Sequence, residues 1–232
     1  EKLCRLAETD ERVAAVTPAM ISGSGLTAFG KRFPDRLYDV GIAEGHAVTF
    51  SAGLAAGGAV PVCAIYSSFL QRAYDNIIHD AAIGKAHVVF AVDRAGIVPG
   101  DGATHQGIFD ISFLTAIPNM TVLAPSCFSE LRKMLDYAVN VHNAPIAIRY
   151  PRGPERVSLD NGDFVLSRAA RVRRGSDIAI AAEGQSVAKA LAAAKLLSEK
   201  GISAEVIDVR TVKPMDFETV FESAQKCGVL LS

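Results

Sequence analysis

Glu44 is the residue of this chain best placed to do chemistry, in the run Asp39-Val-Gly-Ile-Ala-Glu44-Gly-His46. The apolar residues before Glu44 predict a buried strand, and the Ala- and Gly-rich residues after it predict a helix. Ligands of open parallel sheets bind outside the carboxyl ends of the strands, so a carboxylate at this junction can meet a ligand. The structural alternative is an acidic residue that favours the start of a helix through the helix dipole.

Three further predicted strands end in residues that can bind or transfer charge. The apolar runs 61–65, 87–92 and 144–148 are followed by Tyr66, Ser67, Ser68 and Phe69, by Asp93 and Arg94, and by Arg149, Tyr150 and Arg152. Because the carboxyl ends of parallel strands meet at one edge of a sheet, we expect all four strand ends to share one rim. Phe69 offers a flat face for stacking, with core filling as its alternative. Arg94 offers the fork of donors that suits a phosphate or a carboxylate.

The loop 93–105, DRAGIVPGDGATH, is rich in glycine and in ionisable groups. Loops of this kind carry function more often than packing. His105 could relay a proton near neutral pH, with a solvated loop histidine as the equal alternative. The remaining histidines have no spacing typical of metal ligands and are interpreted as structural: His46, His79, His87 and His142.

The composition excludes some classes of function. Half of the 232 residues are hydrophobic, and 24 basic residues face 25 acidic ones, so nothing indicates binding to nucleic acid or to an anionic membrane. No apolar run approaches the roughly 18 residues of a membrane span, and the first residues lack the apolar centre of a signal peptide. The cysteines contain no CxxC pair, which fits a reducing compartment: Cys4, Cys63, Cys127 and Cys227. We therefore expect a cytoplasmic protein.

Short β-rich runs alternate with longer helical patterns, which predicts an α/β fold with a parallel, doubly wound sheet. Strands are expected near 13–17, 37–42, 60–66, 87–92, 120–124 and 145–149, and helices near 1–9, 23–33, 44–57, 70–84 and 127–141. A polar stretch with Pro and Gly follows at 152–163 and predicts a linker. A second pattern then places strands at 178–182 and 204–209 around a helix at 186–199, before a last helix near 216–226. The expected domains are 1–155 and 164–232, joined by the linker 156–163.

Five segments together resemble the 1-deoxy-D-xylulose-5-phosphate synthase family of the transketolase superfamily: SGSG, FPDRLYDVGIAEGHAV, YSSFLQRAYDNIIHD, DRAGI followed by DGATHQG, and IRYPRG. The resemblance covers nearly the whole chain. It implies a pyrimidine-binding domain of thiamine diphosphate enzymes, followed by a partial α/β transketolase C-terminal domain. It also implies that the N-terminal domain with the Mg²⁺ and diphosphate ligands lies outside the chain. The start without methionine and the end after an apolar run agree with an internal piece of a longer protein.

The resemblance also implies a reaction and the roles of individual residues. The family condenses pyruvate and glyceraldehyde 3-phosphate, with loss of CO₂, for isoprenoid, thiamine and pyridoxal biosynthesis, and a homodimer is expected. Glu44 matches the glutamate that hydrogen-bonds the aminopyrimidine ring of thiamine diphosphate, Phe69 matches the residue stacked on that ring, and Arg72 supports their loop. The remaining matches line the substrate pocket, with His105 as a second catalytic residue and the two arginines as phosphate ligands: Tyr66, Arg94, Asp101, His105 and Arg152.

The triplet Gly100-Asp101-Gly102 is similar to the GDG metal signature of thiamine diphosphate enzymes, but its context differs. Asn119 follows too soon for the second ligand of that signature, Asn140 and Asn143 follow too late, and no predicted strand leads into the triplet. We therefore expect no metal site here. Gly45 is a local departure from the family, in which many members carry Gln.

Two other functions are compatible with parts of the pattern. A separately encoded transketolase half, or the beta subunit of a 2-oxoacid dehydrogenase, would use the same pyrimidine-binding domain, but the run FLQRAYD and the loop DRAG favour the synthase. A non-catalytic assembly module is the alternative from another class, and the intact Glu44, Phe69, Arg94 and Arg152 argue against it. Because the diphosphate-binding domain is absent, we expect no catalysis by this chain alone.

Overall fold

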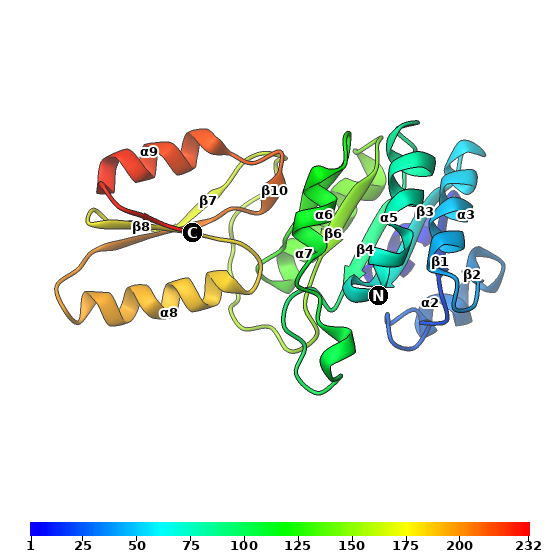
Figure 1. Cartoon of the computed structure of the whole chain (residues 1–232), viewed down its shortest axis with the longest axis horizontal. Helices are drawn as coiled ribbons and strands as arrows, with labels where there is room; N and C mark the ends of the chain where they lie inside the picture. The colour runs from blue at the N-terminus through cyan, green and yellow to red at the C-terminus, as the bar shows by residue number, and fades with distance from the viewer. The chain divides into compact units, whose positions relative to one another are not determined.

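The computed structural model describes residues 1–232, which pack as two compact units (Figure 1). The first unit is Glu1–Val122 with Leu135–Arg152, and the second is Leu123–Met134 with Gly153–Ser232. Each unit is described by itself. The units are discontinuous in the sequence, and the expected domain limits of 1–155 and 164–232 stay a prediction.

The first unit is built on a parallel sheet whose strands lie in the order β5-β6-β4-β3-β1-β2. The strands are β1 (Val13–Thr17), β2 (Leu37–Asp39), β3 (Val60–Tyr66), β4 (Val89–Asp93), β5 (Thr121–Leu123) and β6 (Ile146–Arg149). β1 pairs in parallel with β2 and β3, and β4 pairs in parallel with β3 and β6. Burial of β1 and β4 along their whole length explains why they read as continuous apolar runs.

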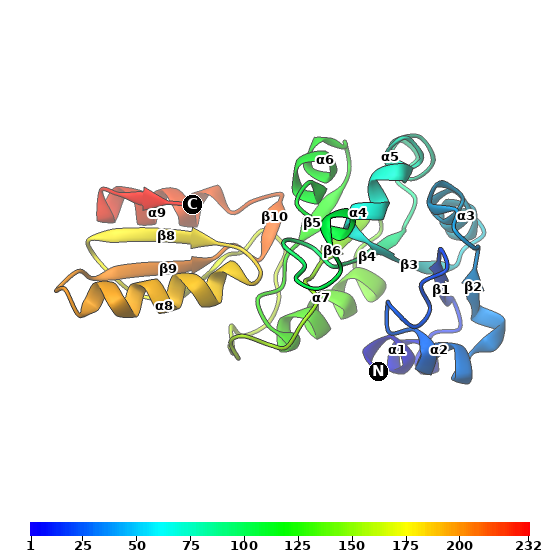
Figure 2. The ribbon, with the colours of Figure 1, turned by 60° about the horizontal axis from the view of Figure 1, so that its bottom comes forward.

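Helices cover both faces of this sheet, which confirms the doubly wound α/β class (Figure 2). One face carries α3 (Glu44–Ala56), α4 (Ser67–Leu70), α5 (Tyr74–Asn76) and α6 (Asp110–Ala116). The other carries α1 (Lys2–Thr9), α2 (Thr27–Arg32) and the part of α7 (Phe128–Asn140) from Leu135 onward. None of the helices of the chain has both the length and the apolar character needed to cross a membrane.

Several predicted elements of the first unit differ from the structure. The helix expected near 23–33 is observed only over Thr27–Arg32. The strand expected over 37–42 ends at Asp39, because Gly41 has a φ of +72° and Asp39 Oδ1 accepts hydrogen bonds from the backbone N–H groups of Ala19 and Gly41. The helix expected over 70–84 is broken into α4, a 3₁₀ turn at Gln71–Ala73, α5 and a π-helical turn at Ile77–Ala82. Its apolar pattern does not reveal a change of helix type. Helix α6 was not expected.

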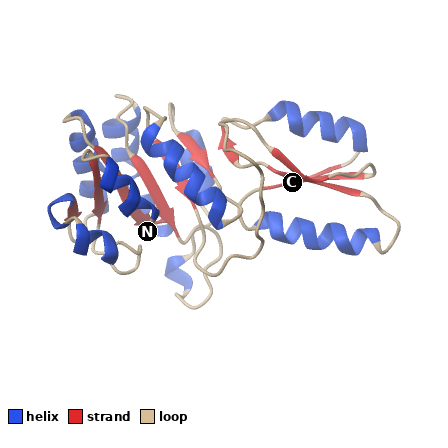
Figure 3. Cartoon of the chain, turned by 180° about the vertical axis from the view of Figure 1, so that it is seen from behind, coloured by secondary structure: helices blue, strands red, loops and turns tan.

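The second unit contains a smaller sheet in the order β11-β8-β9-β7. Its strands are β7 (Ala170–Arg173), β8 (Ile178–Ala182), β9 (Ala204–Asp208) and β11 (Leu230–Leu231), and the short β10 (Thr211–Lys213) follows β9. Helices α8 (Ser186–Ser198) and α9 (Phe217–Cys227) lie on opposite faces of this sheet (Figures 1 and 3). Strand β7, in which every second residue is an arginine, is antiparallel to β9. This strand was not predicted from the sequence.

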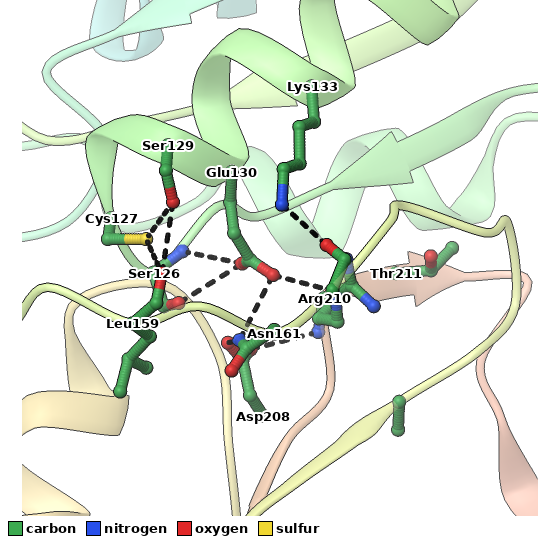
Figure 4. Close-up of polar contacts among 12 residues, drawn as sticks. Ser126, Cys127, Ser129, Glu130, Lys133, Leu159, Asn161, Asp208, Arg210 and Thr211 are labelled. Carbon is green, nitrogen blue, oxygen red and sulfur yellow. Dashed lines mark hydrogen bonds and ion pairs between the residues drawn. The ribbon is translucent and has the colours of Figure 1, made fainter.

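A buried polar cluster lies at the end of β9 in the second unit (Figure 4). We use the name buried cluster for Ser126, Glu130, Asn161, Asp208 and Arg210. Glu130 Oε1 forms an ion pair with Arg210 Nε at 2.7 Å, and Asn161 Nδ2 donates to both Glu130 Oε1 and Asp208 Oδ2 at 3.1 Å. The backbone N–H and the hydroxyl of Ser126 donate to Glu130 Oε2. The cluster therefore ties α7 and the segment around Asn161 to the end of β9.

Candidate functional site

The three central strands of the first unit end level with one another. Tyr66 of β3 pairs with Asp93 of β4, and Val92 of β4 pairs with Arg149 of β6. Since these strands are parallel, the residues that follow them emerge at the same edge of the sheet. The convergence predicted for these three strand ends is present, whereas the fourth predicted strand end, at Glu44, is the start of a helix.

Glu44 is the first residue of α3, and only 5% of its surface is exposed. The expectation that Glu44 directly follows a buried strand is wrong. β2 ends at Asp39, and Ile42, between β2 and Glu44, is 82% exposed. Nη1 of Arg72 donates a hydrogen bond to Oε1 of Glu44 at 2.6 Å, whereas Oε2 has no hydrogen-bond partner within the chain. A buried carboxylate with one occupied and one available oxygen can accept or share a proton with a ligand.

Three rings form a group beside this carboxylate. The rings of Tyr66 and Phe69 are stacked, with centroids 5.9 Å apart and planes 20° apart. His105 meets Phe69 edge-on at 5.1 Å, and its centroid is 6.4 Å from that of Tyr66. The guanidinium carbon of Arg72 lies 5.0 Å from the centroid of Phe69. Arg72 therefore joins Glu44 to the rings, with Phe69 in contact with Tyr66, His105 and Arg72.

Four charged residues form a group that contacts Tyr66 through Arg94, and we call Asp93, Arg94, Asp101 and Arg152 the rim cluster. Nε of Arg94 donates to Asp101 at 3.1 Å, and Nη1 donates to Asp93 at 2.9 Å. Arg152 also pairs with Asp101, so this carboxylate bridges both arginines. The guanidinium carbon of Arg94 lies 3.6 Å from the centroid of the Tyr66 ring. The rim cluster therefore has two positive and two negative groups in contact.

The surroundings change the acidity of three groups of the rim. The hydrogen bond from Arg152, with a further one from Arg94, holds the pKa of Asp101 below its usual value. Burial raises the pKa of Asp93, although Arg94 opposes the rise. Burial also raises the pKa of Tyr66, again against the effect of Arg94. Tyr66 therefore keeps its hydroxyl proton at neutral pH and acts as a donor or a platform, not as a base.

The structure brings all eight predicted site residues together in the first unit. Glu44, Arg72, Phe69, His105 and Tyr66 form one connected set, and Tyr66 joins it to Arg94, Asp101 and Arg152. Arg149 was expected at the same rim, but it pairs with the buried Asp110 at 2.8 Å. Arg149 therefore holds Asp110, the first residue of α6, and does not face the rim.

Sequence reasoning placed Gly23 at the start of a helix and gave it no role in the site, but Gly23 lies in a loop before α2. The carbonyl oxygen of Gly23 accepts a hydrogen bond from Arg94 Nη1 at 3.1 Å. A Cβ atom on Gly23 would lie 1.8 Å from the hydroxyl oxygen of Tyr66, so a larger residue here would displace the Tyr66 ring. The hydroxyl groups of Ser24 and Ser68, which flank Gly23 and Phe69 in the sequence, are buried without a partner in the chain. The signal for this loop was its SGSG run.

Gly100 and Gly102 both have positive φ angles, 94° and 82°, so the GDG triplet forms a loop and does not end a strand. Its Asp101 side chain is occupied by the two arginines of the rim cluster. Within the 232 residues, no group of three or more His, Cys, Asp or Glu side chains is arranged to hold a metal ion.

Comparisons with known proteins agree with this arrangement. Residues 1–156 match the family described as the transketolase pyrimidine binding domain, and residues 167–232 match the transketolase C-terminal domain. The chain is 50% identical to 1-deoxy-D-xylulose-5-phosphate synthase from Thermomicrobium roseum and 49% identical to 1-deoxy-D-xylulose-5-phosphate synthase 1 from Geobacter sulfurreducens. Each alignment covers 100% of this chain and 37% of the relative. The chain therefore spans little more than a third of these relatives.

Solved structures have the same fold. A split-gene transketolase, solved as an inactive beta4 tetramer, superposes with a TM-score of 0.87 at 34% identity and covers 99% of this chain and 75% of that chain. A transketolase from Pichia stipitis in complex with sedoheptulose 7-phosphate gives a TM-score of 0.79 at 20% identity, over 90% of this chain and 33% of that chain. The chain belongs to the transketolase superfamily, in which it comprises a pyrimidine-binding domain followed by C-terminal domain sequence.

Proposed function

We propose that this chain is the pyrimidine-binding part of a thiamine diphosphate-dependent transferase that condenses pyruvate with glyceraldehyde 3-phosphate. The product is 1-deoxy-D-xylulose 5-phosphate, and CO₂ is released. One observation carries the proposal: the buried Glu44 carboxylate lies beside the Phe69 ring, with Arg72 in contact with both. The 50% identity to relatives named as this synthase supports the choice of reaction.

The residues of the first unit fit an aminopyrimidine ring. Oε2 of Glu44 is available to share a proton with a ring nitrogen, Phe69 offers a face for stacking, and the buried hydroxyl of Ser68 has no partner in the chain. Arg72 holds the other oxygen of Glu44 and so orients the carboxylate. Thiamine diphosphate, when bound, supplies the reactive carbon and the electron sink of the reaction. The Mg²⁺ and diphosphate ligands are assigned to a domain outside this chain.

The substrate groups are assigned to the rim cluster and to His105. Arg94 and Arg152 are the cations for the phosphate of the aldehyde, and His105, in contact with both rings, is the group for proton transfer. Asp101 already bridges the two arginines. A phosphate that binds both arginines therefore has to share them with Asp101 or replace it.

Activity is expected only when a diphosphate-binding domain is present, because this chain provides one side of the cofactor site. The test adds thiamine diphosphate, Mg²⁺, pyruvate and glyceraldehyde 3-phosphate to the chain, with and without that domain, and measures deoxyxylulose phosphate. Product should form only in the assembled enzyme. Product from the chain alone would contradict the claim that this chain provides only one side of the cofactor site. No product from the assembled enzyme would contradict the proposed reaction.

A second candidate is one half of a split transketolase. It is favoured by the likeness to the split-gene transketolase, of whose chain 75% is covered here. The two functions differ in the donor substrate, because transketolase takes a ketose phosphate and releases no CO₂. Supplying the assembled enzyme with xylulose 5-phosphate or with pyruvate, and measuring consumption and released CO₂, separates them. A homodimer and a cytoplasmic location stay predictions.

A further inference from the structure

Asp93, the last residue of β4, binds both ends of the residue that follows it. Its Oδ1 accepts a hydrogen bond from the backbone N–H of Arg94 at 2.6 Å, and its Oδ2 accepts one from Nη1 of Arg94 at 2.9 Å. Both residues are buried, each with 8% of its surface exposed. One carboxylate therefore fixes the backbone and the side chain of its neighbour at the same time.

The backbone of Arg94 adopts the left-handed conformation, with a φ of 58°. Residues other than glycine rarely adopt this conformation, and it persists only where the surrounding structure enforces it. In an extended strand, consecutive side chains point to opposite faces, so the carboxylate of Asp93 would not reach the guanidinium of the next residue. The left-handed turn places both groups on one side, where the carboxylate holds them.

The consequence is a defined position for the guanidinium of Arg94. Its carbon lies 3.6 Å from the centroid of the Tyr66 ring, and its Nη1 also donates to the carbonyl oxygen of Gly23 at 3.1 Å. Nε donates to Asp101. Nη2 is left without a partner in the chain, so the guanidinium keeps one nitrogen available for an incoming anion.

We infer that Asp93 is a positioning residue for anion recognition: it holds Arg94 in the left-handed conformation and keeps its guanidinium over Tyr66, with Nη2 presented to the ligand. The inference rests on the proposed function of Arg94 as a ligand of the substrate phosphate. A merely structural role for Asp93 would be to neutralise the buried arginine. Loss of that role would affect the KM for the aldehyde and the KM for pyruvate alike.

The test uses Asp93→Asn in the enzyme assembled with its diphosphate-binding domain. Asparagine keeps the size and one acceptor oxygen, but its amide nitrogen cannot accept the bond from Nη1 of Arg94. We expect the KM for glyceraldehyde 3-phosphate to rise about tenfold, as for loss of one hydrogen bond to a charged group, while the KM for pyruvate and kcat change less than about twofold.

Asp93→Glu is the second variant and keeps the negative charge, so it also keeps the neutralisation of Arg94. Its longer side chain does not place a carboxylate oxygen at the same point to accept the hydrogen bond from the backbone N–H of Arg94. A rise in the KM for the aldehyde in both variants, with the KM for pyruvate changed less than about twofold, is the expected result. A normal KM for the aldehyde in either variant would overturn the inference, since a normal value in Asp93→Glu alone would mean that Asp93 only neutralises Arg94.

A double-mutant cycle separates the inference from the proposed function. In the background of Arg94→Ala, Asp93→Asn should have no further effect on the KM for the aldehyde, because Asp93 acts through Arg94. An additive effect would overturn the inference and leave the role of Arg94 intact. If Arg94→Ala by itself left that KM unchanged, the proposed role of Arg94 would fail, independently of Asp93.

Discussion

The ends of β4 and β9 contain the same local arrangement in two different units. Each strand ends in a buried aspartate, Asp93 or Asp208, whose Oδ1 accepts a hydrogen bond from the backbone N–H of a nearby arginine. Both arginines are left-handed, with φ of 58° for Arg94 and 59° for Arg210. Each guanidinium lies near an aromatic ring, Tyr66 in the first unit and Phe164 in the second.

The two arrangements differ in what surrounds them. In the buried cluster, Arg210 is 3% exposed and Glu130 is 1% exposed, and Asn161 and Ser126 donate to the carboxylates. In the rim cluster, the side chain of Arg152 is 51% exposed and Nη2 of Arg94 has no partner in the chain. The same arrangement therefore holds structure where other side chains complete it, and can hold a ligand where it stays open.

The largest expected effect comes from removing the arginine of the buried cluster. Arg210→Ala leaves Glu130 and Asp208 buried without a cation and should lower the free energy of unfolding by about 3–5 kcal/mol. Arg94→Ala should lower it by less, about 1–3 kcal/mol, because only one buried carboxylate, that of Asp93, loses its cation, whereas Asp101 keeps Arg152 as a partner. Urea unfolding of both variants of the chain measures the difference, and equal losses would remove the distinction between the clusters.

The second prediction concerns pH. Burial, together with the nearby charge of Glu130, raises the pKa of Asp208 to about 7. The folded state therefore binds this proton more tightly than the unfolded state does. The contribution of Asp208 to stability is complete below about pH 4 and is lost as the pH rises toward 7, by an amount on the order of a few kcal/mol.

The measurement compares the chain with its Asp208→Asn variant by urea unfolding at pH 5 and pH 8. Asparagine does not titrate, so the difference in unfolding free energy between the two proteins should change with pH. Carboxyl groups outside the buried cluster contribute equally to both proteins and cancel in this difference. A difference that is the same at both pH values would show that Asp208 does not carry a raised pKa.

The smallest expected effect is that of Asp101→Asn on stability. Asp101 pairs with the half-exposed Arg152 and with Nε of Arg94, and an asparagine in its place keeps one acceptor oxygen for these donors. Pairs with an exposed partner contribute little and are screened by salt. We expect the midpoint of urea unfolding to stay unchanged within error. A fall as large as that of Arg210→Ala would mean that the rim cluster also holds the fold.

The strand ends of the first unit were predictable, since apolar runs followed by polar residues identify them. That rule led from the sequence to Tyr66, Arg94 and their neighbours. The role of Asp93 was not predictable, because it depends on the left-handed turn at Arg94. The buried cluster was not predictable either: Glu130, Asn161 and Asp208 come from three distant segments, and no local pattern connects them.

The departures in secondary structure have similar causes. The apolar pattern of 70–84 is compatible with α-helix, 3₁₀ and π-helical turns alike, so it could not show where the helix breaks. The end of β2 at Asp39 depends on hydrogen bonds from Ala19 and Gly41, of which the first is distant in the sequence. Glu44 was nevertheless located correctly at the start of a helix.

The central claim is that the Glu44 carboxylate acts on the pyrimidine ring of the cofactor. The most direct test is Glu44→Ala in the assembled enzyme, with turnover and thiamine diphosphate binding measured on the same preparation. The account predicts a loss of turnover of about a thousandfold or more, as for loss of a group that holds a reacting proton, with cofactor affinity largely retained. A nearly normal rate would contradict it.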